Sequence, residues 1–290
     1  MSDPLVLIDA DVLGRNRTGD ETYVLNLLRS LPAVSGGLRL AAVTRRPDLV
    51  PAGVEAIELP ARFQELRMGW AVPRLLRRLR PAVAHFQHAL PLTCPCPAVV
   101  TVHDLSFERD PTLMGFWDRL VFRTFVPRAA RGAARVLAVS ERTKADLIEL
   151  YGIPSERIAV TTNGVDPAFA PGEGEPDGYL LFVGAIQARK SPLVAAEAAA
   201  ELGRPLVVVG PEKEPDLARE LERRGAELRG YVEKDELAQL YRGAAALLMP
   251  SRFEGFGLPV LEAMACGTPV VAAPEPALRE VAGEAAIFAE

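Results

Sequence analysis

Two glutamates stand eight positions apart in the segment SRFEGFGLPVLEAMACGTPVV, residues 251–271. Glu254 falls in a glycine-rich loop, and Glu262 falls about one turn into an otherwise apolar predicted helix with Pro259 near its start. Because a carboxylate on a buried helix face needs a polar partner, ribose hydroxyls would suit Glu262, and Glu254 could reach a second hydroxylated group. The alternative is that both are solvated surface acids, as most glutamates are.

The loop between the two glutamates predicts a site for an anion. Its glycines, Gly255 and Gly257, allow the backbone to approach a ligand closely. The helix that follows presents free N–H groups and a partial positive charge at its start, which suits phosphate. We therefore expect substrate contacts from Gly255, Phe256, Gly257 and Leu258.

Two adjacent cations occur in the segment VGAIQARKSP, residues 183–192, just after a predicted strand. Arg189 and Lys190 could hold a diphosphate, Arg through its planar fork and Lys as a point charge. The alternative is a solvated entry to a helix. No GxxxxGK[ST] loop occurs, and no GxGxxG follows a strand, which counts against a P-loop and against a nicotinamide dehydrogenase.

The elements that must position these residues alternate along the whole chain. Strands are expected at 4–10, 38–44, 82–88, 97–104, 135–140 and 157–164, and again at 179–185, 205–210, 226–230, 245–251, 268–273 and 285–289. Helices lie between them, for example at 141–152, where Ser140 can cap the first turn. Continuous apolar strands alternating with helices predict parallel sheets covered on both faces.

A segment rich in Pro, Gly and acidic residues at 166–178 interrupts this pattern. We therefore predict an α/β protein of two doubly wound, Rossmann-like parallel-sheet domains, 1–168 and 179–290, joined by a linker at 169–178. The domains are expected to face a cleft, with the chemistry at the carboxyl ends of the strands.

Bulk composition excludes several classes of protein. The 290 residues are 49% hydrophobic and 24% charged, with a net charge of −5, and contain only three cysteines. The acidity argues against a nucleic-acid partner. The cysteine count argues against a disulfide scaffold, so Cys94 and Cys96 are interpreted as buried or incidental thiols. Without an apolar run of about 18 residues or a signal peptide, the expected location is cytoplasmic. Charge is uneven: residues 1–168 carry 21 Lys and Arg against 18 Asp and Glu, and the rest carry 12 against 20.

The segment EGFGLPVLEAMACGTPVV resembles the glutamate-spaced signature of the retaining, nucleotide-sugar-dependent glycosyltransferases of family 4, which have the GT-B fold. VGAIQARKSP resembles the diphosphate-binding Arg/Lys segment of that family. TVHDLSFERDP, AVSERTKADLIELYGIPSERIAV and NGVDPAFAP resemble its other recurring segments. The resemblance covers nearly the whole chain and makes the first domain the acceptor side and the second the nucleotide-sugar side.

The resemblance implies a role for each matching residue of the second domain. Glu262 is expected to bind the nucleotide ribose, and Glu254 to face the donor sugar. Arg189 and Lys190 are expected to neutralise the leaving diphosphate, a task that other enzymes give to a divalent metal. No metal or other cofactor is therefore expected.

In the first domain, the resemblance places His103 beside the transferred sugar and Gly19 against the phosphates or the acceptor. Gly14 and Gly19 do not form the tight glycine cluster of the family. The chain also ends at Glu290, where family members usually continue through further helices, so a truncated second domain is expected.

Two pairs with the spacing of metal ligands are interpreted as structural. Asp9 and Asp11 end the first predicted strand, away from the expected diphosphate site. His85 and His88 in HFQH have no third ligand that the sequence reveals, so we expect strand-end histidines with structural roles.

Residues 62–81, RFQELRMGWAVPRLLRRLRP, combine six arginines with Phe63, Trp70 and several leucines. This composition would allow peripheral contact with an anionic membrane at the inner face, or with an acceptor that carries phosphate. The alternative is an exposed amphipathic helix whose arginines are solvated.

The expected function is transfer of a hexose from a nucleotide sugar, with GDP-mannose the weakly preferred donor, to a glycan or lipid-linked acceptor with retention. His103, Arg189, Lys190 and Glu254 are the predicted catalytic residues, and no protein nucleophile is assigned. Two alternatives stay open: a nucleotide-sugar-binding module without turnover, and a nucleotide-sugar epimerase, which explains EGFGLPVLE less well.

Overall fold

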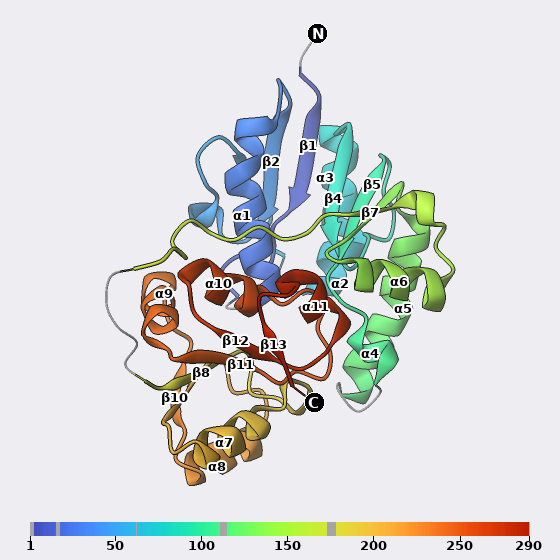
Figure 1. The fold of residues 1–290 in the computed structure, drawn as a ribbon. Helices are drawn as coiled ribbons and strands as arrows, with labels where there is room; N and C mark the ends of the chain where they lie inside the picture. Colours follow the sequence, from blue (N-terminus) through green and yellow to red (C-terminus); the bar gives the residue numbers. More distant parts are fainter. Residues whose placement is uncertain (1–2, 16–17, 62, 111–114, 173–177, 290) are drawn as a thin grey trace. The chain divides into compact units, whose positions relative to one another are not determined.

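The computed structural model describes residues 3–15, 18–61, 63–110, 115–172 and 178–289 (Figure 1). The chain divides into two compact units, Met1–Thr162 and Asn163–Glu290. Each unit is an α/β domain built on one parallel sheet, which confirms the predicted fold class. Part of the predicted linker, residues 173–177, lies outside the described residues.

The first unit contains a seven-stranded parallel sheet in the order β3-β2-β1-β4-β5-β6-β7. Its strands are β1 (Leu5–Asp9), β2 (Arg39–Thr44), β3 (Glu55–Glu58), β4 (Val83–Gln87), β5 (Ala98–Val102), β6 (Arg135–Ala138) and β7 (Ile158–Val160). Its α-helices are α1 (Thr18–Val34), α2 (Gln64–Leu66), α3 (Val72–Leu79), α4 (Ser106–Arg109), α5 (Phe116–Gly132) and α6 (Glu141–Tyr151).

Successive strand residues point to opposite faces of this sheet, and each face is buried in a core of its own. Ile8 packs with Val24 and Leu28 of α1 on one face. Its neighbour Leu7 belongs to a separate core with Leu76 of α3. Continuous apolar strands are therefore needed, as the sequence pattern indicates.

The second unit contains a six-stranded parallel sheet in the order β10-β9-β8-β11-β12-β13. Its strands are β8 (Leu180–Val183), β9 (Leu206–Val209), β10 (Glu227–Gly230), β11 (Ala246–Met249), β12 (Val270–Ala272) and β13 (Ile287–Phe288). Its α-helices are α7 (Pro192–Glu201), α8 (Pro215–Arg223), α9 (Lys234–Gly243), α10 (Leu258–Cys266) and α11 (Pro276–Ala282).

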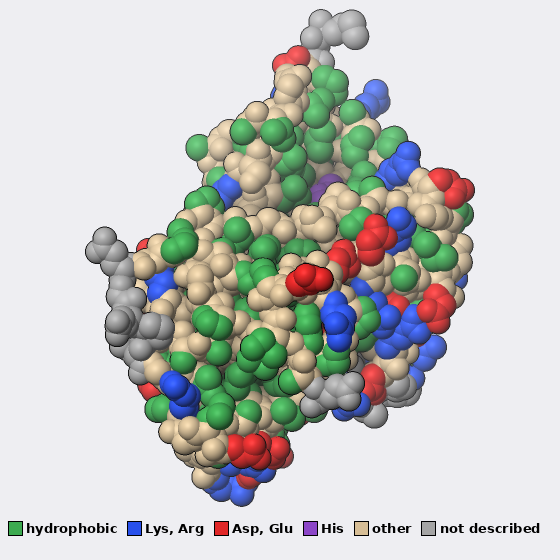
Figure 2. All heavy atoms as spheres, in the orientation of Figure 1, with side chains coloured by type: hydrophobic (Ala, Val, Ile, Leu, Met, Phe, Trp, Pro, Cys, Tyr) green, Lys and Arg blue, Asp and Glu red, His purple; other side chains and the backbone are tan. Residues whose placement is uncertain are grey.

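This second sheet is also covered on both faces. Figure 1 shows α7 and α8 on one side of it and α9, α10 and α11 on the other. The cores agree: Leu180 and Phe182 pack in the cluster that includes α7 and α8, whereas Leu181 and Val183 pack in the one that includes α9, α10 and α11. On the face drawn in Figure 2, acidic and basic side chains are interspersed over the surface.

Most predicted elements are present at their expected positions. Ser140 caps α6 as predicted, since its hydroxyl accepts a hydrogen bond from the Thr143 N–H at 3.0 Å. The strand β3 was not anticipated. Its four residues, EAIE, include no fully buried side chain and lie at the sheet edge, so they carry little hydrophobic signal.

Residues 63–80 do not form one continuous amphipathic α-helix. The short α2 runs into a π-helical turn, Arg67–Ala71, before α3 begins. The alternative in which the arginines are solvated is wrong for Arg67. Its side chain is fully buried and donates to the Asp9 carboxylate at 2.5 and 3.0 Å. A buried guanidinium needs such a partner, so this pair explains why β1 ends in an aspartate. Arg62 lies outside the described residues.

Candidate functional site

Three predicted site residues of the second unit lie together after the neighbouring strands β8 and β11. Arg189 and Lys190 occupy a 3₁₀ turn, Ala188–Lys190. The Lys190 Nζ lies 2.5 Å from Glu254 Oε1, and the Arg189 Nη1 lies 3.6 Å from Glu254 Oε2. The Lys190 and Glu254 side chains are only 11% and 7% exposed. The alternatives of a solvated lysine and a solvated surface glutamate are therefore wrong for Lys190 and Glu254.

One side-chain and one backbone hydrogen bond join the two loops of this cluster to each other. The Arg189 guanidinium donates to the carbonyl oxygen of Phe253 at 2.7 Å. In return, the Arg252 N–H donates to the Arg189 carbonyl at 3.0 Å. The cationic turn and the glutamate loop therefore form one connected, largely buried structure.

The start of α10 needs a glycine at one position. Gly257 has φ +109°, and a Cβ there would lie 2.7 Å from Leu278 Cδ2. Leu258 then begins α10, with Pro259 in its first turn as predicted. Gly255 and Phe256 lie in the loop before it, both buried. Anion binding by the N–H groups of this turn stays a prediction.

Glu262 lies on α10 and is buried, with 8% of its surface exposed. Burial raises the pKa of its carboxyl group to about 7, although the Tyr241 hydroxyl, which donates to Oε2 at 2.8 Å, opposes the rise. Asp166 raises this pKa further and Lys234 lowers it. The polar partner that the sequence analysis required is thus a tyrosine of α9, which no local pattern singled out.

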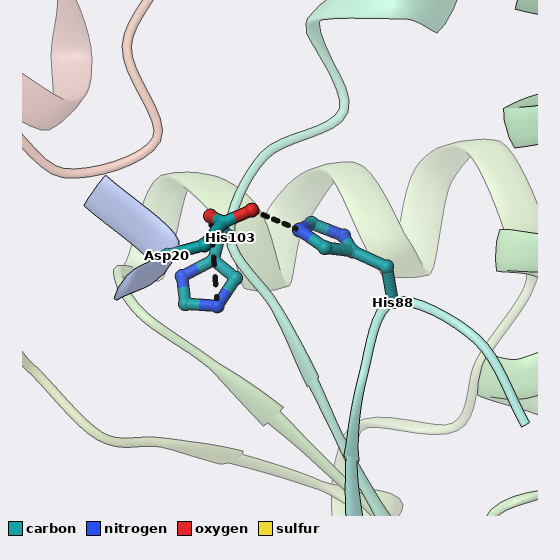
Figure 3. A group of neighbouring side chains, drawn as sticks. All are labelled: Asp20, His88 and His103. Carbon is teal, nitrogen blue, oxygen red and sulfur yellow. Dashed lines mark ion pairs between the residues drawn. The ribbon is translucent and has the colours of Figure 1, made fainter. Parts of the chain in front are cut away.

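In the first unit, two histidines and an aspartate meet at the carboxyl ends of neighbouring strands (Figure 3). His88 follows β4, His103 follows β5, and Asp20 lies in the first turn of α1. Each imidazole Nε2 lies 3.9 Å from an Asp20 carboxylate oxygen. The sequence analysis considered the two histidines separately and did not single out Asp20.

His103 is held by neighbours on both sides of its ring. Its Nε2 lies 3.0 Å from Gln87 Oε1, and the Tyr23 ring meets it edge-on at 4.8 Å between centroids. Burial lowers the pKa of His103 to about 4, so the imidazole is neutral at pH 7. A neutral imidazole can donate one hydrogen bond and accept one.

The remaining candidates of the first unit have structural partners. His85 is buried in β4 with its Nε2 2.7 Å from Thr101 Oγ1, and burial lowers its pKa to about 4. Asp9 pairs with Arg67. Asp11 pairs with Arg45 at 2.8 Å. These contacts agree with the structural roles predicted for His85, Asp9 and Asp11.

Gly19 lies in the first turn of α1, and a Cβ there would meet nothing within 4 Å. No packing in the described structure therefore demands a glycine at this position. The predicted site residues fall into two groups: Gly19 and His103 in the first unit, and Arg189, Lys190, Glu254, Gly255, Phe256, Gly257, Leu258 and Glu262 in the second.

Two family models match this chain. Residues 17–169 match the family described as Glycosyltransferase Family 4, and residues 177–290 match the one described as Glycosyl transferases group 1. Together they include all the predicted site residues.

Curated relatives carry glycosyltransferase names. O-antigen chain mannosyltransferase B of Escherichia coli is 30% identical over 282 residues, which cover 87% of this chain and 70% of that protein. O-antigen chain mannosyltransferase RfbU of Salmonella typhimurium is 29% identical over 98% of this chain and 86% of its own length. D-inositol 3-phosphate glycosyltransferase of Frankia alni is 38% identical over 51% of this chain, which spans only 44% of that protein.

Solved structures share the fold at low sequence identity. Sucrose-phosphate synthase from Thermosynechococcus elongatus superposes with a TM-score of 0.73 at 18% identity, covering 96% of this chain and 82% of that one. Anabaena Alr3699/HepE, solved with UDP and glucose, gives 0.71 at 17% identity over 96% and 82%. WaaG, a glycosyltransferase involved in lipopolysaccharide biosynthesis, gives 0.69 at 21% identity over 93% and 81%. The GT-B fold expected from the sequence is confirmed.

Proposed function

Because this chain belongs to glycosyltransferase family 4, we propose that it transfers a hexose from a nucleotide sugar to a glycan or lipid-linked acceptor, with retention of the anomeric configuration. The relatives named O-antigen chain mannosyltransferases favour mannose as the hexose and GDP-mannose as the donor. They also favour a role in polysaccharide biosynthesis.

The observation that carries this proposal is the cluster of Arg189, Lys190 and Glu254 in the second unit. Negative charge develops on the diphosphate as its bond to the sugar breaks. Two preorganised cations in a largely buried site stabilise that charge at little reorganisation cost. Glu254 holds Lys190 in place and offers an acceptor to a hydroxyl of the donor sugar. In this scheme the two cations take the part that a metal ion takes in other transferases.

Glu262 supplies the proposed ribose contact. The Tyr241 hydroxyl uses one of its oxygens, and a carboxylate can accept several hydrogen bonds at once. A bound ribose would add donors to a carboxylate whose burial disfavours the ionised form. Nucleotide binding would therefore stabilise the charged state of Glu262.

In the first unit, we assign His103 to the transferred sugar and Gly19 to the phosphates or the acceptor. A neutral imidazole suits His103 for hydrogen bonding to sugar hydroxyls. Gly19 precedes Asp20 in the first turn of α1, and the N–H groups at the start of a helix have no intrahelical partners, which suits an anion. The proposal assigns no protein nucleophile, because the leaving phosphate itself guides the acceptor to the same face of the sugar.

We also propose a cytoplasmic protein with peripheral contact to the inner membrane face through residues 62–81. Phe63, Leu66 and Trp70 are each more than half exposed, and the Arg74 guanidinium lies 5.6 Å from the Trp70 ring centroid. Exposed aromatic rings beside arginines suit the interface of an anionic bilayer. In the described part of the chain, no helix has the length and apolar character to cross a membrane.

The test is nucleotide release from several nucleotide sugars, GDP-mannose among them, with and without candidate lipid-linked glycan acceptors. We expect release of GDP that depends on the acceptor. Retention is read from the anomeric configuration of the product by NMR. Donor binding without release would support a binding module instead, and a changed sugar on the nucleotide would support an epimerase.

A further inference from the structure

The last residue of β4, Gln87, contacts the histidine that we assign to the transferred sugar. Its Oε1 lies 3.0 Å from the Nε2 of His103, which follows β5. Residues two positions apart in a strand point to the same face of the sheet, and His85 of β4 makes a similar contact with Thr101 of β5 at 2.7 Å. Of these two cross-strand hydrogen bonds, the one at the carboxyl ends of the strands holds His103.

The neighbours of the His103 Nε2 determine which ring nitrogen carries the proton. Gln87 Oε1 can only accept a hydrogen bond, and an Asp20 carboxylate oxygen lies 3.9 Å from the same nitrogen (Figure 3). Two acceptors that face one nitrogen favour a hydrogen on it. The imidazole is therefore the Nε2–H tautomer, which donates through Nε2 and keeps a lone pair on Nδ1.

This imidazole stays neutral because it is buried. Burial lowers the pKa of His103 to about 4 and is the largest cause of its shift. The titratable groups that act on this pKa are Asp20 and Asp104, which raise it, and His88 and His85, which lower it. A neutral ring of fixed tautomer presents one donor and one acceptor at fixed positions.

Gln87 is a poor residue for packing alone. Its amide nitrogen is buried and has no hydrogen-bond partner among the described residues. A buried donor without an acceptor lowers stability, and an apolar side chain of similar length would avoid that cost. Glutamine at this position therefore fits a role in the site better than a role in folding.

We propose that Gln87 is a positioning residue for the transfer: it holds His103 as the Nε2–H tautomer, so that Nδ1 accepts a hydrogen bond from a hydroxyl of the transferred sugar. This inference rests on the proposed transfer of a hexose. Without the Gln87 carbonyl group, the ring can exchange between tautomers and orientations. A neutral ring with its proton on Nδ1 cannot accept a hydrogen bond there.

Nuclear magnetic resonance reads the tautomer directly, because the two nitrogens of a neutral imidazole have different ¹⁵N shifts. The chain contains only three histidines, so its imidazole spectrum is simple when no histidine tag is attached. His85→Gln and His88→Gln identify the signals of the other two rings. At pH 7, without donor or acceptor, we expect the Nε2–H tautomer for His103 in the parent protein and a mixture of tautomers in Gln87→Met.

Tyr151→Phe is the matched control. It removes a hydrogen bond of the same unit, from the hydroxyl of a buried tyrosine to Glu108 Oε1 at 3.1 Å, and should leave the His103 spectrum unaltered. Gln87→Glu keeps an acceptor of the same size and adds a negative charge. In that variant His103 should keep its tautomer and titrate about 1 to 3 pH units higher, an effect that a merely structural side chain would not have.

Kinetics connect the tautomer to the reaction. Gln87→Met should lower kcat for acceptor-dependent nucleotide release about tenfold or more, because the sugar contact is misplaced. Binding of GDP, measured by calorimetry, should be unchanged, since the proposed nucleotide contacts belong to the second unit. Circular dichroism shows whether each variant is folded.

An Nδ1–H tautomer or a charged His103 in the parent protein at pH 7 would overturn the assignment. So would an unaltered His103 spectrum or an unchanged kcat in Gln87→Met. The spectra need neither donor nor acceptor, so they reject the role of Gln87 independently of the reaction. A parent protein that turns over no nucleotide sugar would reject the proposed transfer instead.

Discussion

Lys190 and Glu254 lie 64 residues apart in the chain and place opposite charges against each other in a nearly buried position. Such a pair depends on both members, because removal of one leaves the other as a poorly solvated charge. Arg189 also lies near Glu254, so the carboxylate balances two cations. A bound diphosphate would add negative charge to this arrangement.

We expect Lys190→Met to lower the free energy of unfolding by about 3 kcal/mol, because the Glu254 carboxylate loses its closest cation. Lys190→Met with Glu254→Gln should cost less, since the buried Glu254 charge is removed together with its closest cation. Both should greatly reduce acceptor-dependent nucleotide release. Urea unfolding and initial rates measure the two effects separately.

Arg223→Met is the control for these variants, since Arg223 is an exposed arginine of α8 in the same unit. It should change stability by less than about 0.5 kcal/mol and leave the rate unaltered. If the double variant were as unstable as Lys190→Met, the pairing would not account for the loss.

Glu262 should make stability depend on pH. Its folded pKa of about 7 lies above the ordinary value of 4.5, so the folded state binds more protons than the unfolded state between these values. The free energy of unfolding should therefore fall as pH rises from about 4.5 to 7, by about 3 kcal/mol from this group. Glu262→Gln should flatten that part of the profile.

Urea unfolding of the parent protein and of Glu262→Gln at pH 5 and pH 8 measures this difference. The change between the two pH values should be larger in the parent protein. Equal changes in the two proteins would contradict the raised pKa.

At the scale of elements, the start of α10 is the most constrained position of the candidate site. Gly257 combines a positive φ with close packing against Leu278, whereas Gly267, at the other end of α10, has a positive φ with open space around it. A comparison of alanine variants at the two positions therefore distinguishes the cost of backbone strain from the cost of tight packing.

Gly257→Ala should lower the free energy of unfolding by about 2 kcal/mol or more, because strain and overlap with Leu278 add. Gly267→Ala should lower it by about 1 kcal/mol, from strain alone. Gly257→Ala should also weaken donor binding, as measured by calorimetry. Equal effects of the two variants on stability would exclude the packing argument.

The order of the parallel strands also determines which residues of the first unit lie together. Neighbouring strands β4 and β5 end at the same edge of their sheet, with Gln87 opposite Thr101 in the register. The residues that follow, His88 and His103, are therefore brought together although they lie 15 positions apart. Helix α1 adds Asp20 from a distant part of the sequence.

At the scale of the whole molecule, exposed apolar and basic side chains of residues 62–81 form the proposed membrane contact. Changing Arg77, Arg78 and Arg80 to Glu should lower binding to vesicles with anionic lipid by about 100-fold or more at low salt. Each arginine near such a surface contributes about 1 kcal/mol, and reversal adds repulsion. Co-sedimentation with vesicles over a range of salt measures the effect.

A matched triple reversal at Arg219, Arg223 and Arg229 of the second unit changes the net charge equally. It should leave vesicle binding nearly unaltered. If the two triple variants bound alike, net charge would explain the attraction and residues 62–81 would not be the contact.

The amino-acid sequence by itself determined the two parallel sheets, the cap of α6 and the loop-to-helix form of residues 251–266. These follow from local signals: apolar runs, capping residues, glycine and proline. The edge strand β3 was not predicted, because its EAIE residues are mostly exposed and give little hydrophobic signal. The alternative of an exposed amphipathic helix at 62–81 with solvated arginines is wrong at Arg67, which forms a buried pair with Asp9.

Only the tertiary structure decided which distant side chains meet. Tyr241 as the partner of Glu262, Lys190 as the partner of Glu254, and Asp20 beside His88 and His103 all depend on strand order and helix packing. Local periodicity indicates that a carboxylate will be buried, but it does not specify the donor that satisfies it. That choice is made when elements far apart in the sequence share one core and exclude water from the groups between them.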